Sequence, residues 1–343
     1  SRGSVGVTTS AADTIAAGST PTWQRWARRH GWTFGVWLLL VVLVAWYSTL
    51  IPSFGSFQFA TIITNGTPWV FLAAAQAVVV IAGGLDLGVG GLLVLTNVAT
   101  ARFMDGQSFE VTIIFAVAAI LAAVVLNAFV GWIITVSKVP DIVITLGSLY
   151  VFQGLALAVL PNPGGGTSEG FRWLFTGSPR GIGSNPYPAA ILISVVILVV
   201  AWWMAKTRSG LSLYAVGSDK TAAYLSGIRA ARVKVMSYAV GGALAAMAGL
   251  SITAIAGRGN ATAVGGNATL NSVAAIVLGG VALTGGIGSV IAVVPAGLIL
   301  FFLNPILTAM GVDPNRAQIV QGVLIVVVMM VTGLIEWRRR RRV

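Results

Sequence analysis

Acidic side chains are the main candidates for chemistry in this sequence, and only nine occur among 343 residues. Most of them fall between long apolar runs or at their ends. Asp86 differs, because it lies inside the apolar, glycine-rich stretch IAGGLDLGVGGLLVL at 81–95. An active site needs several titratable groups that converge, and the one histidine, His30, has no second histidine with which to hold a metal. The sequence therefore predicts no catalytic residue and no metal site.

Nucleotide and thiol chemistry are also missing from the sequence. No Gly-x-x-x-x-Gly-Lys-Ser/Thr motif occurs, and none of the four lysines follows a glycine, so there is no P-loop for nucleotide phosphates. There are no cysteines, which excludes disulfides. A coupled secondary transporter would carry several intramembrane carboxylates, and only Asp86 fits that description. We therefore expect no cofactor on this chain and an energy source outside it.

The composition indicates a membrane protein. Hydrophobic residues make up 57% of the chain and charged residues 9%, whereas soluble domains carry about 25% charged residues. Apolar runs of about 20 residues mark membrane spans. They cover roughly 33–51, 60–82, 86–103, 111–136, 141–160, 188–206, 236–256, 271–284, 288–310 and 317–336. The predicted fold class is therefore all-α, a polytopic membrane protein with about ten transmembrane helices.

The net charge of +12 is concentrated beside the apolar runs. Lipid headgroups are the expected partner of such clusters, and the positive-inside rule places them in the cytoplasm. No nucleic-acid-binding signature accompanies the charge, so no nucleic-acid partner is expected. Counting spans from the first cluster puts both chain ends in the cytoplasm. The three clusters are Arg25, Arg28 and Arg29; Lys206, Arg208, Lys220, Arg229, Arg232 and Lys234; and Arg338 to Arg342.

Three regions follow from these patterns. Residues 1–21 are rich in Ser, Thr, Ala and Gly and lack apolar periodicity, so we expect a disordered N-terminal tail without a signal-peptide core. Residues 22–337 form the transmembrane domain, with a basic cytoplasmic loop at 207–235. Residues 338–343 form a basic cytoplasmic tail. Arginines and tryptophans at 23–32 fit an amphipathic segment on the membrane surface or an aromatic belt before the first span.

Glycine-rich interruptions break the apolar pattern twice, at 81–91 and 277–289. Both follow one apolar half and precede another, so we expect broken or re-entrant helices there. The two stretches resemble a weak internal repeat of the kind found around transport paths, although two glycine-rich stretches can also match by chance. Asp86 would then cap the second half of a broken helix, or it would face the transport path.

The loop at 214–242 carries a short helix signal. Ser218 or Asp219 can cap the start of DKTAAYLSG, and Gly227 suits its end. A short capped helix on a basic loop between two spans suits docking of a partner. An ordinary positive-inside loop that touches nothing is the simpler alternative.

Four segments in order resemble the permease subunits of ABC importers for ribose, xylose, arabinose, galactose and related sugars, within a wider group that includes branched-chain amino-acid permeases. The matched residues include Asp86, Pro140, Gly227 and the Gly279-Gly280 pair. The resemblance covers roughly residues 33–336. The segments are AGGLDLGVGGLLVL at 82–95, KVPDIVITLGSLYVFQGLALAV at 138–159, VGSDKTAAYLSGI at 216–228 and LNSVAAIVLGGVALTGGIGSV at 270–290.

The resemblance implies a bacterial inner-membrane permease that is not itself an enzyme. Two permease subunits, identical or paralogous, would form the pore, and an extracytoplasmic binding protein would deliver a pentose or hexose. Separate ATPase subunits, which hold the ATP and Mg, would dock on residues 217–229. The implied ATPase-coupling residues are Gly217, Asp219, Lys220, Thr221, Ala222, Ala223, Ser226, Gly227 and Arg229.

Polar side chains inside the spans are the candidates for a sugar path. Neutral amides and hydroxyls suit a neutral polyol, and Trp69 or Tyr150 could stack on a sugar face, although each group could equally bond a neighbouring helix. Small residues at Gly241, Ala245 and Gly249 would let helices approach closely. The candidate path residues are Gln76, Asp86, Asn97, Asn127, Thr145, Gln153, Asn271, Thr284 and Asn304.

Several positions depart from the family pattern. Gly88 stands where serine is usual, Asp141 where an apolar residue is usual, and Lys220-Thr221 where an acidic residue is usual. Ile287 and the run ATLN at 268–271 also differ, and these changes leave the sugar open. A branched-chain amino-acid permease is one alternative, but it would need charged groups for a zwitterion. A stand-alone sugar facilitator is another.

Overall fold

The computed structural model describes residues 22–262 and 265–313, and ten residues between 316 and 330. The predicted tails at 1–21 and 338–343 and much of the predicted span 317–336 lie outside the described residues, as do the side chains of the basic and aromatic residues at 23–29. In chain order the helices are α2 (Thr22–Leu50), α3 (Ser56–Ile81), α4 (Val89–Phe103), α5 (Phe109–Ser137), α6 (Asp141–Val159), α7 (Glu169–Thr176), α8 (Tyr187–Lys206), α9 (Arg208–Ser218), α10 (Lys220–Leu225), α11 (Ala230–Ala256), α12 (Gly265–Leu278) and α13 (Val290–Ala309).

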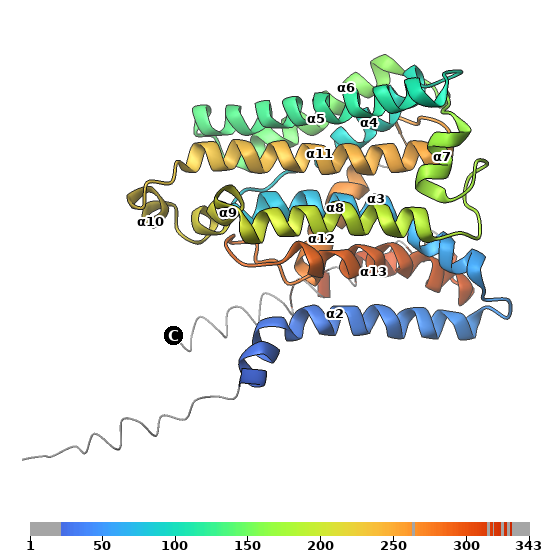
Figure 1. The fold of residues 1–343 in the computed structure, drawn as a ribbon, viewed down its shortest axis with the longest axis horizontal. Coiled ribbons are helices and arrows are strands. Elements are labelled where there is room, and N and C mark those ends of the chain that lie inside the picture. The colour runs from blue at the N-terminus through green and yellow to red at the C-terminus, as the bar shows by residue number, and fades with distance from the viewer. Residues whose placement is uncertain are drawn as a thin grey trace, which may run out of the picture.

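The described chain is an all-α bundle, as predicted. Seven of its helices are long and apolar enough to cross a membrane, and α4 and α12 are shorter apolar helices. The long helices run side by side, with α9 and α10 at one end of the bundle and α7 at the other (Figure 1). With 15 residues, α4 is only about 22 Å long at 1.5 Å per residue, less than the roughly 30 Å of a hydrocarbon core. The glycine-rich breaks explain the shortened helices.

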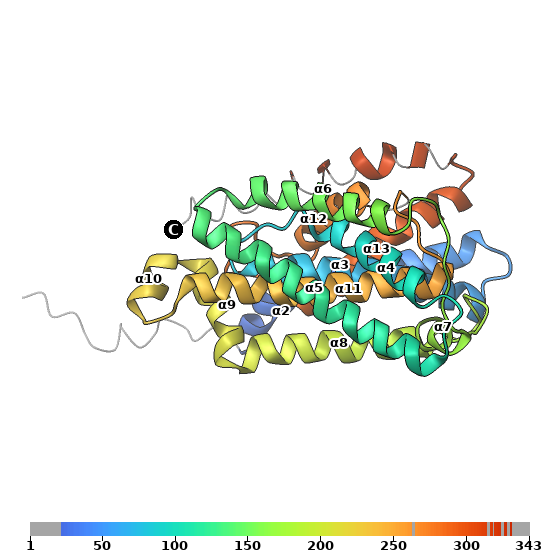
Figure 2. The same ribbon diagram turned by 90° about the horizontal axis from the view of Figure 1, so that it is seen from above.

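Helix α3 forms the centre of the bundle. Of its apolar stretch 83% is buried, against 22% for α5, whose outward side chains are apolar and suit lipid. Figure 2 shows α3 and α11 between α6 on one side and α8 on the other. The small side chains of Ala73, Ala74, Ala75 and Ala77 let neighbours pack on α3 from several sides.

Helix α11 packs closely through glycine, as its small residues predicted. A Cβ placed on Gly249 would lie 2.5 Å from the Leu93 carbonyl oxygen of α4, and one on Gly242 would lie 2.5 Å from the Ala123 carbonyl oxygen of α5. Real Cβ atoms do not approach so closely. These two contacts hold α4 and α5 against α11.

Two predicted boundaries were wrong for the same reason. The span predicted at 271–284 ends at Leu278, and the one at 86–103 begins at Val89. In both places glycine-rich segments, 279–289 and 82–88, leave the helix although their side chains are apolar enough to continue it. Hydropathy therefore overextends a helix where glycine turns the backbone.

The two glycine-rich interruptions differ in the helices they join. The first connects the long α3 to the short α4, and the second connects the short α12 to the long α13. The order of long and short helices is therefore reversed. Both breaks nevertheless lie at the same place in the bundle, because the Gly286 amide donates a 2.9 Å hydrogen bond to the Ile81 carbonyl.

Candidate functional site

The first break, residues 82–88, turns the chain between α3 and α4. Gly83 takes a positive φ of 76°, and its amide and that of Gly84 donate to the carbonyls of Val80 and Val79 at 2.9 and 3.0 Å. These bonds satisfy the last carbonyls of α3, in the manner of a glycine-ended helix. The chain then runs without helical structure to Gly88.

Asp86 is fully buried at the start of α4. Its Oδ1 accepts a 2.8 Å hydrogen bond from the Gly88 amide, and its Oδ2 accepts a 2.9 Å bond from the Asn127 amide nitrogen of α5. Asp86 thus bonds the amide of Gly88, the N-cap residue of α4, just before the helix begins, where a negative charge would complement the helix dipole; its role as a cap stays a prediction. A role for Asp86 in the path stays a prediction.

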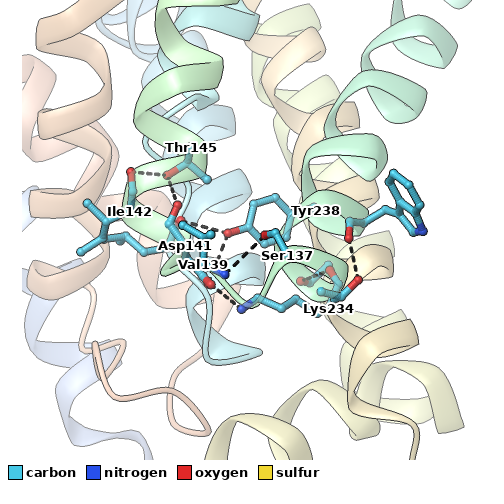
Figure 3. A network of polar contacts seen from close by, with 11 residues as sticks. Ser137, Val139, Asp141, Ile142, Thr145, Lys234 and Tyr238 are labelled. Atoms are coloured by element: carbon cyan, nitrogen blue, oxygen red, sulfur yellow. Dashed lines mark hydrogen bonds and ion pairs between the residues drawn. The ribbon is translucent and has the colours of Figure 1, made fainter.

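A second polar network ties this break to α6 and α11 (Figure 3). The Tyr238 hydroxyl donates to the Leu85 carbonyl at 2.9 Å and lies 3.5 Å from Asp141 Oδ2. Asp141 Oδ1 pairs with the Lys234 ammonium at 2.5 Å. Asp141, one of the residues that depart from the family pattern, therefore has a defined partner on the helix that follows the basic loop.

The basic loop folds into two short helices, α9 and α10. Asp219, not Ser218, caps α10: its Oδ1 accepts from the amides of Thr221 and Ala222 at 2.7 and 3.0 Å. Gly227 takes a φ of 80° and ends the helix, as predicted. The capped helix in the loop is confirmed, and α10 protrudes from one end of the bundle (Figure 1).

Most of the predicted coupling residues are exposed on α10 and in the turns on either side of it. Asp219, Lys220, Thr221, Ala222, Ser226, Gly227 and Arg229 are exposed, whereas Ala223 is buried and packs inward. Tyr224 and Leu225, which the sequence prediction did not include, are 73% and 81% exposed. Two large apolar side chains on a solvent-facing helix suit a partner surface. Their position in the sequence, between polar coupling residues, could have indicated that they belong to the same partner surface.

Gly217, at the end of α9, touches both glycine-rich breaks. A Cβ on Gly217 would overlap the Ile81 carbonyl oxygen and lie 2.5 Å from the Gly286 nitrogen. A Cβ on Gly285 would lie 2.9 Å from both the Gly217 oxygen and the Gly83 Cα. We call this meeting of Gly83, Gly217, Gly285 and Gly286 the glycine junction. It connects the basic loop directly to the backbone of the two broken helices.

Most of the predicted path residues are bonded within the chain. Asn97 Nδ2 donates to Thr253 Oγ1 at 2.9 Å, and Thr145 Oγ1 donates to the Asp141 carbonyl at 2.8 Å. Asn127 Nδ2 bonds both Asp86 and the Tyr238 carbonyl. Asn271 and Asn304 both bond Gln321, at 3.3 Å each. Gln153 is half-buried on α6, where Tyr150 points outward, and Thr284 is exposed in the second break.

Gln76 behaves differently from the other candidates. It is fully buried in α3, and neither its Oε1 nor its Nε2 has a hydrogen-bond partner among the described residues. Among the predicted path residues, Gln76 is thus the one whose buried side chain makes no hydrogen bond with the described residues.

Comparisons with known proteins identify relatives over most of the chain. The family model described as "Branched-chain amino acid transport system / permease component" matches residues 58–329. The chain is 32% identical to the ribose import permease protein RbsC of Escherichia coli K12 over 302 residues, 86% of this chain and 91% of that one. It is 33% identical to RbsC of Bacillus subtilis 168, covering 85% and 90% of the two chains. The D-allose transport system permease protein AlsC of E. coli K12 is 26% identical, covering 88% and 92%. No solved structure matches.

Proposed function

We propose that the chain carries a monosaccharide across the bacterial inner membrane, because it belongs to the permease family whose model matches residues 58–329. This family includes the permease subunits of sugar ABC importers. It is a multi-pass membrane protein of this family and a transport subunit. The sugar would be a pentose or hexose, passed from an extracytoplasmic binding protein to the end of the bundle that carries α7. Both chain ends and α10 would face the cytoplasm, where the basic residues belong.

ATPase subunits would dock on residues 217–229 and supply the energy. The observation that supports this most is the glycine junction, because a displacement of α10 would reach Ile81 and Gly286 through Gly217 without an intervening side chain. Packed elements switch between discrete arrangements, so a small shift at a tight contact can move whole helices. In this proposal ATP and Mg stay on the partner subunits, and this chain performs no covalent chemistry.

A neutral cargo fits the polar groups of the bundle. Inside the described bundle, Asp141 is paired with Lys234, and Asp86 is bonded to Gly88 and Asn127. A branched-chain amino acid is a zwitterion and would need charge-compensating groups, and these two carboxylates already have partners. The neutral amides and hydroxyls therefore favour a sugar over an amino acid.

Purification from native membranes followed by transport assays tests the proposal. The chain should co-purify with an ATPase that carries a P-loop, and the reconstituted complex should import labelled D-ribose or D-allose only with ATP and a sugar-binding protein. Transport in liposomes without either partner would identify a stand-alone facilitator. Import of leucine but of neither sugar would identify an amino-acid permease.

A further inference from the structure

Residues 160–186 connect α6 to α8 and contain α7; we call this segment the α7 loop. Although α6 and α8 flank it in the sequence, its backbone is bonded to other parts of the bundle. Gly164 and Gly259 exchange two hydrogen bonds, of 3.1 and 2.8 Å, and the Gly166 amide donates to the Ala101 carbonyl of α4 at 2.9 Å. The α7 loop is therefore attached to the end of α4 and to the segment that follows α11.

Arg172 of α7 adds a side-chain attachment to α11. Its Nε donates to the Ala254 carbonyl at 3.1 Å, and its Nη2 donates to the Ile255 carbonyl at 3.2 Å. These carbonyls belong to the last turn of α11, so they lack an intrahelical partner and lie at the negative end of the helix dipole. A Cβ on Gly181 or on Gly257 would lie 3.0 Å from a guanidinium nitrogen, so both glycines leave room for this group. Among the described residues no carboxylate pairs with Arg172, and its charge is directed at the end of α11.

Helix α11 runs from the basic loop to the α7 loop. It has 27 residues, so it is about 40 Å long at 1.5 Å per residue, and it contains no proline. By contrast, α3 contains Pro68, and α13 contains Pro295 and Pro305; proline inside a helix removes a hydrogen bond and favours a kink. Helix α11 begins at Ala230, three residues after Gly227, which ends α10. An uninterrupted helix therefore joins the predicted docking helix to the carbonyls that Arg172 bonds.

The ends of α4 and α11 near the α7 loop are bonded to each other. Thr253 Oγ1 of α11 lies 2.9 Å from both Asn97 Nδ2 and Thr100 Oγ1 of α4. The Asn260 amide, just beyond α11, donates to Asn97 Oδ1 at 3.0 Å. Asn97, one of the predicted path residues, thus holds these two helices together, and the α7 loop is attached to both.

We propose that Arg172 is a positioning residue for transport, which makes the α7 loop follow α11 when the partner ATPase subunits displace α10. This rests on the proposed function, in which the ATPases dock at one end of the bundle and the binding protein delivers the sugar at the other. A shift of α10 would pass along α11 as a whole helix, and the two bonds of Arg172 would carry it to the α7 loop. Because the planar guanidinium donates in fixed directions, these bonds set the orientation of α7 as well as its distance from α11.

Apolar contacts should keep α7 in place when Arg172 is replaced. Phe171 and Phe175 of α7 are buried in an apolar cluster that also contains Leu250 and Ala254 of α11. These side chains hold the two helices together but have no fixed direction, unlike hydrogen bonds. Arg172→Met should therefore insert into the membrane and assemble with its partners.

The amount of sugar imported per ATP hydrolysed separates positioning from a structural role. In Arg172→Met this ratio should fall about tenfold, the effect of about one charged hydrogen bond, while ATP hydrolysis continues. Arg172→Lys keeps the charge but not the planar fork, so its ratio should be intermediate. Arg180→Met is the matched control, because it removes an exposed arginine from the same loop, and its ratio should be that of the wild type.

Movement of the α7 loop can be measured directly because the chain has no cysteine. Ser184 is exposed in this loop, and a nitroxide label on Ser184→Cys reports the surroundings of the loop in a full complex whose other subunits are free of cysteine. The electron paramagnetic resonance spectrum should change when ATP and vanadate arrest the complex. Arg172→Met should lose most of this change, whereas Arg180→Met should retain it.

The outcomes distinguish the two proposals. If the wild-type complex imports no sugar, the proposed function fails. If it imports sugar but its label does not respond to ATP, or if Arg172→Met matches Arg180→Met in sugar per ATP or in label response, the role of Arg172 is overturned. A lower unfolding temperature of Arg172→Met at an unchanged ratio would show a structural role alone, which also overturns it. If Arg172→Met does not insert, Arg172→Lys takes its place in the same comparisons.

Discussion

The backbone amide of Gly286 donates a 2.9 Å hydrogen bond to the carbonyl oxygen of Ile81, although 205 residues separate them. Ile81 is the last residue of α3, and its carbonyl is one of those a helix end leaves without an intrahelical partner. The second break thus supplies the N–H donor for a carbonyl that has no partner within α3. Gly217 packs against both the Ile81 carbonyl and the Gly286 amide. The end of α3 is therefore held between the second break and the basic loop.

A side chain at Gly217 should interfere with coupling. In Gly217→Val the added atoms would overlap the Ile81 carbonyl oxygen and crowd the Gly286 nitrogen, so the loop must move away from the breaks. Overpacking of this kind costs about 1–3 kcal/mol. We expect ATP hydrolysis by the reconstituted complex to continue while sugar uptake falls sharply.

Gly147→Ala is the matched control for this substitution. Gly147 lies on α6, where an added Cβ would meet nothing within 4 Å, and alanine favours helix by up to about 1 kcal/mol over glycine. Uptake should stay normal in this variant. If Gly217→Val also imports sugar at the wild-type rate per ATP hydrolysed, the junction has no part in coupling.

The end of α10 should be sensitive to proline. Gly227 has a φ of 80°, and its amide donates to the Tyr224 carbonyl at 2.9 Å. Proline fixes φ near −65° and has no N–H, so Gly227→Pro must reshape the predicted docking surface. We expect the variant to insert into the membrane but to lose ATP-driven uptake. Gly227→Asn, which tolerates a positive φ, should retain uptake, and full activity of the proline variant would argue against docking at this loop.

The Lys234–Asp141 ion pair should matter for stability. The side chains are 14% and 18% exposed, so the pair is partly buried, and removing one partner should cost between the roughly 1 kcal/mol of an exposed pair and the about 3–5 kcal/mol of a fully buried one. Lys234→Met should therefore lower the thermal unfolding temperature in detergent. The double variant Asp141→Leu/Lys234→Met should recover most of the loss, because no lone charge remains. A double variant less stable than both single variants would contradict this account.

Local features of the site were predictable from sequence, whereas contacts between distant segments were not. The cap at Asp219, the helix end at Gly227 and the break at 82–88 depend on residues within a few positions of each other. The pairing of Asp141 with Lys234 joins two span ends 93 residues apart, and no periodicity indicates it. The glycine junction was missed because its partners meet through backbone atoms. Glycine patterns show where a chain can approach closely but not which segment it approaches.

The role of Asp86 can be tested by comparing two substitutions. Asn keeps one oxygen, which can accept the Gly88 amide but not also the Asn127 amide nitrogen, so Asp86→Asn should lose some stability and still import sugar if the carboxylate is only a cap. Asp86→Ala leaves both the Gly88 amide and the Asn127 amide nitrogen without this acceptor. Each buried unmade bond costs about 1–3 kcal/mol, so thermal stability should drop and uptake should fall with it. A changed preference between D-ribose and D-allose in Asp86→Asn would instead place Asp86 on the path.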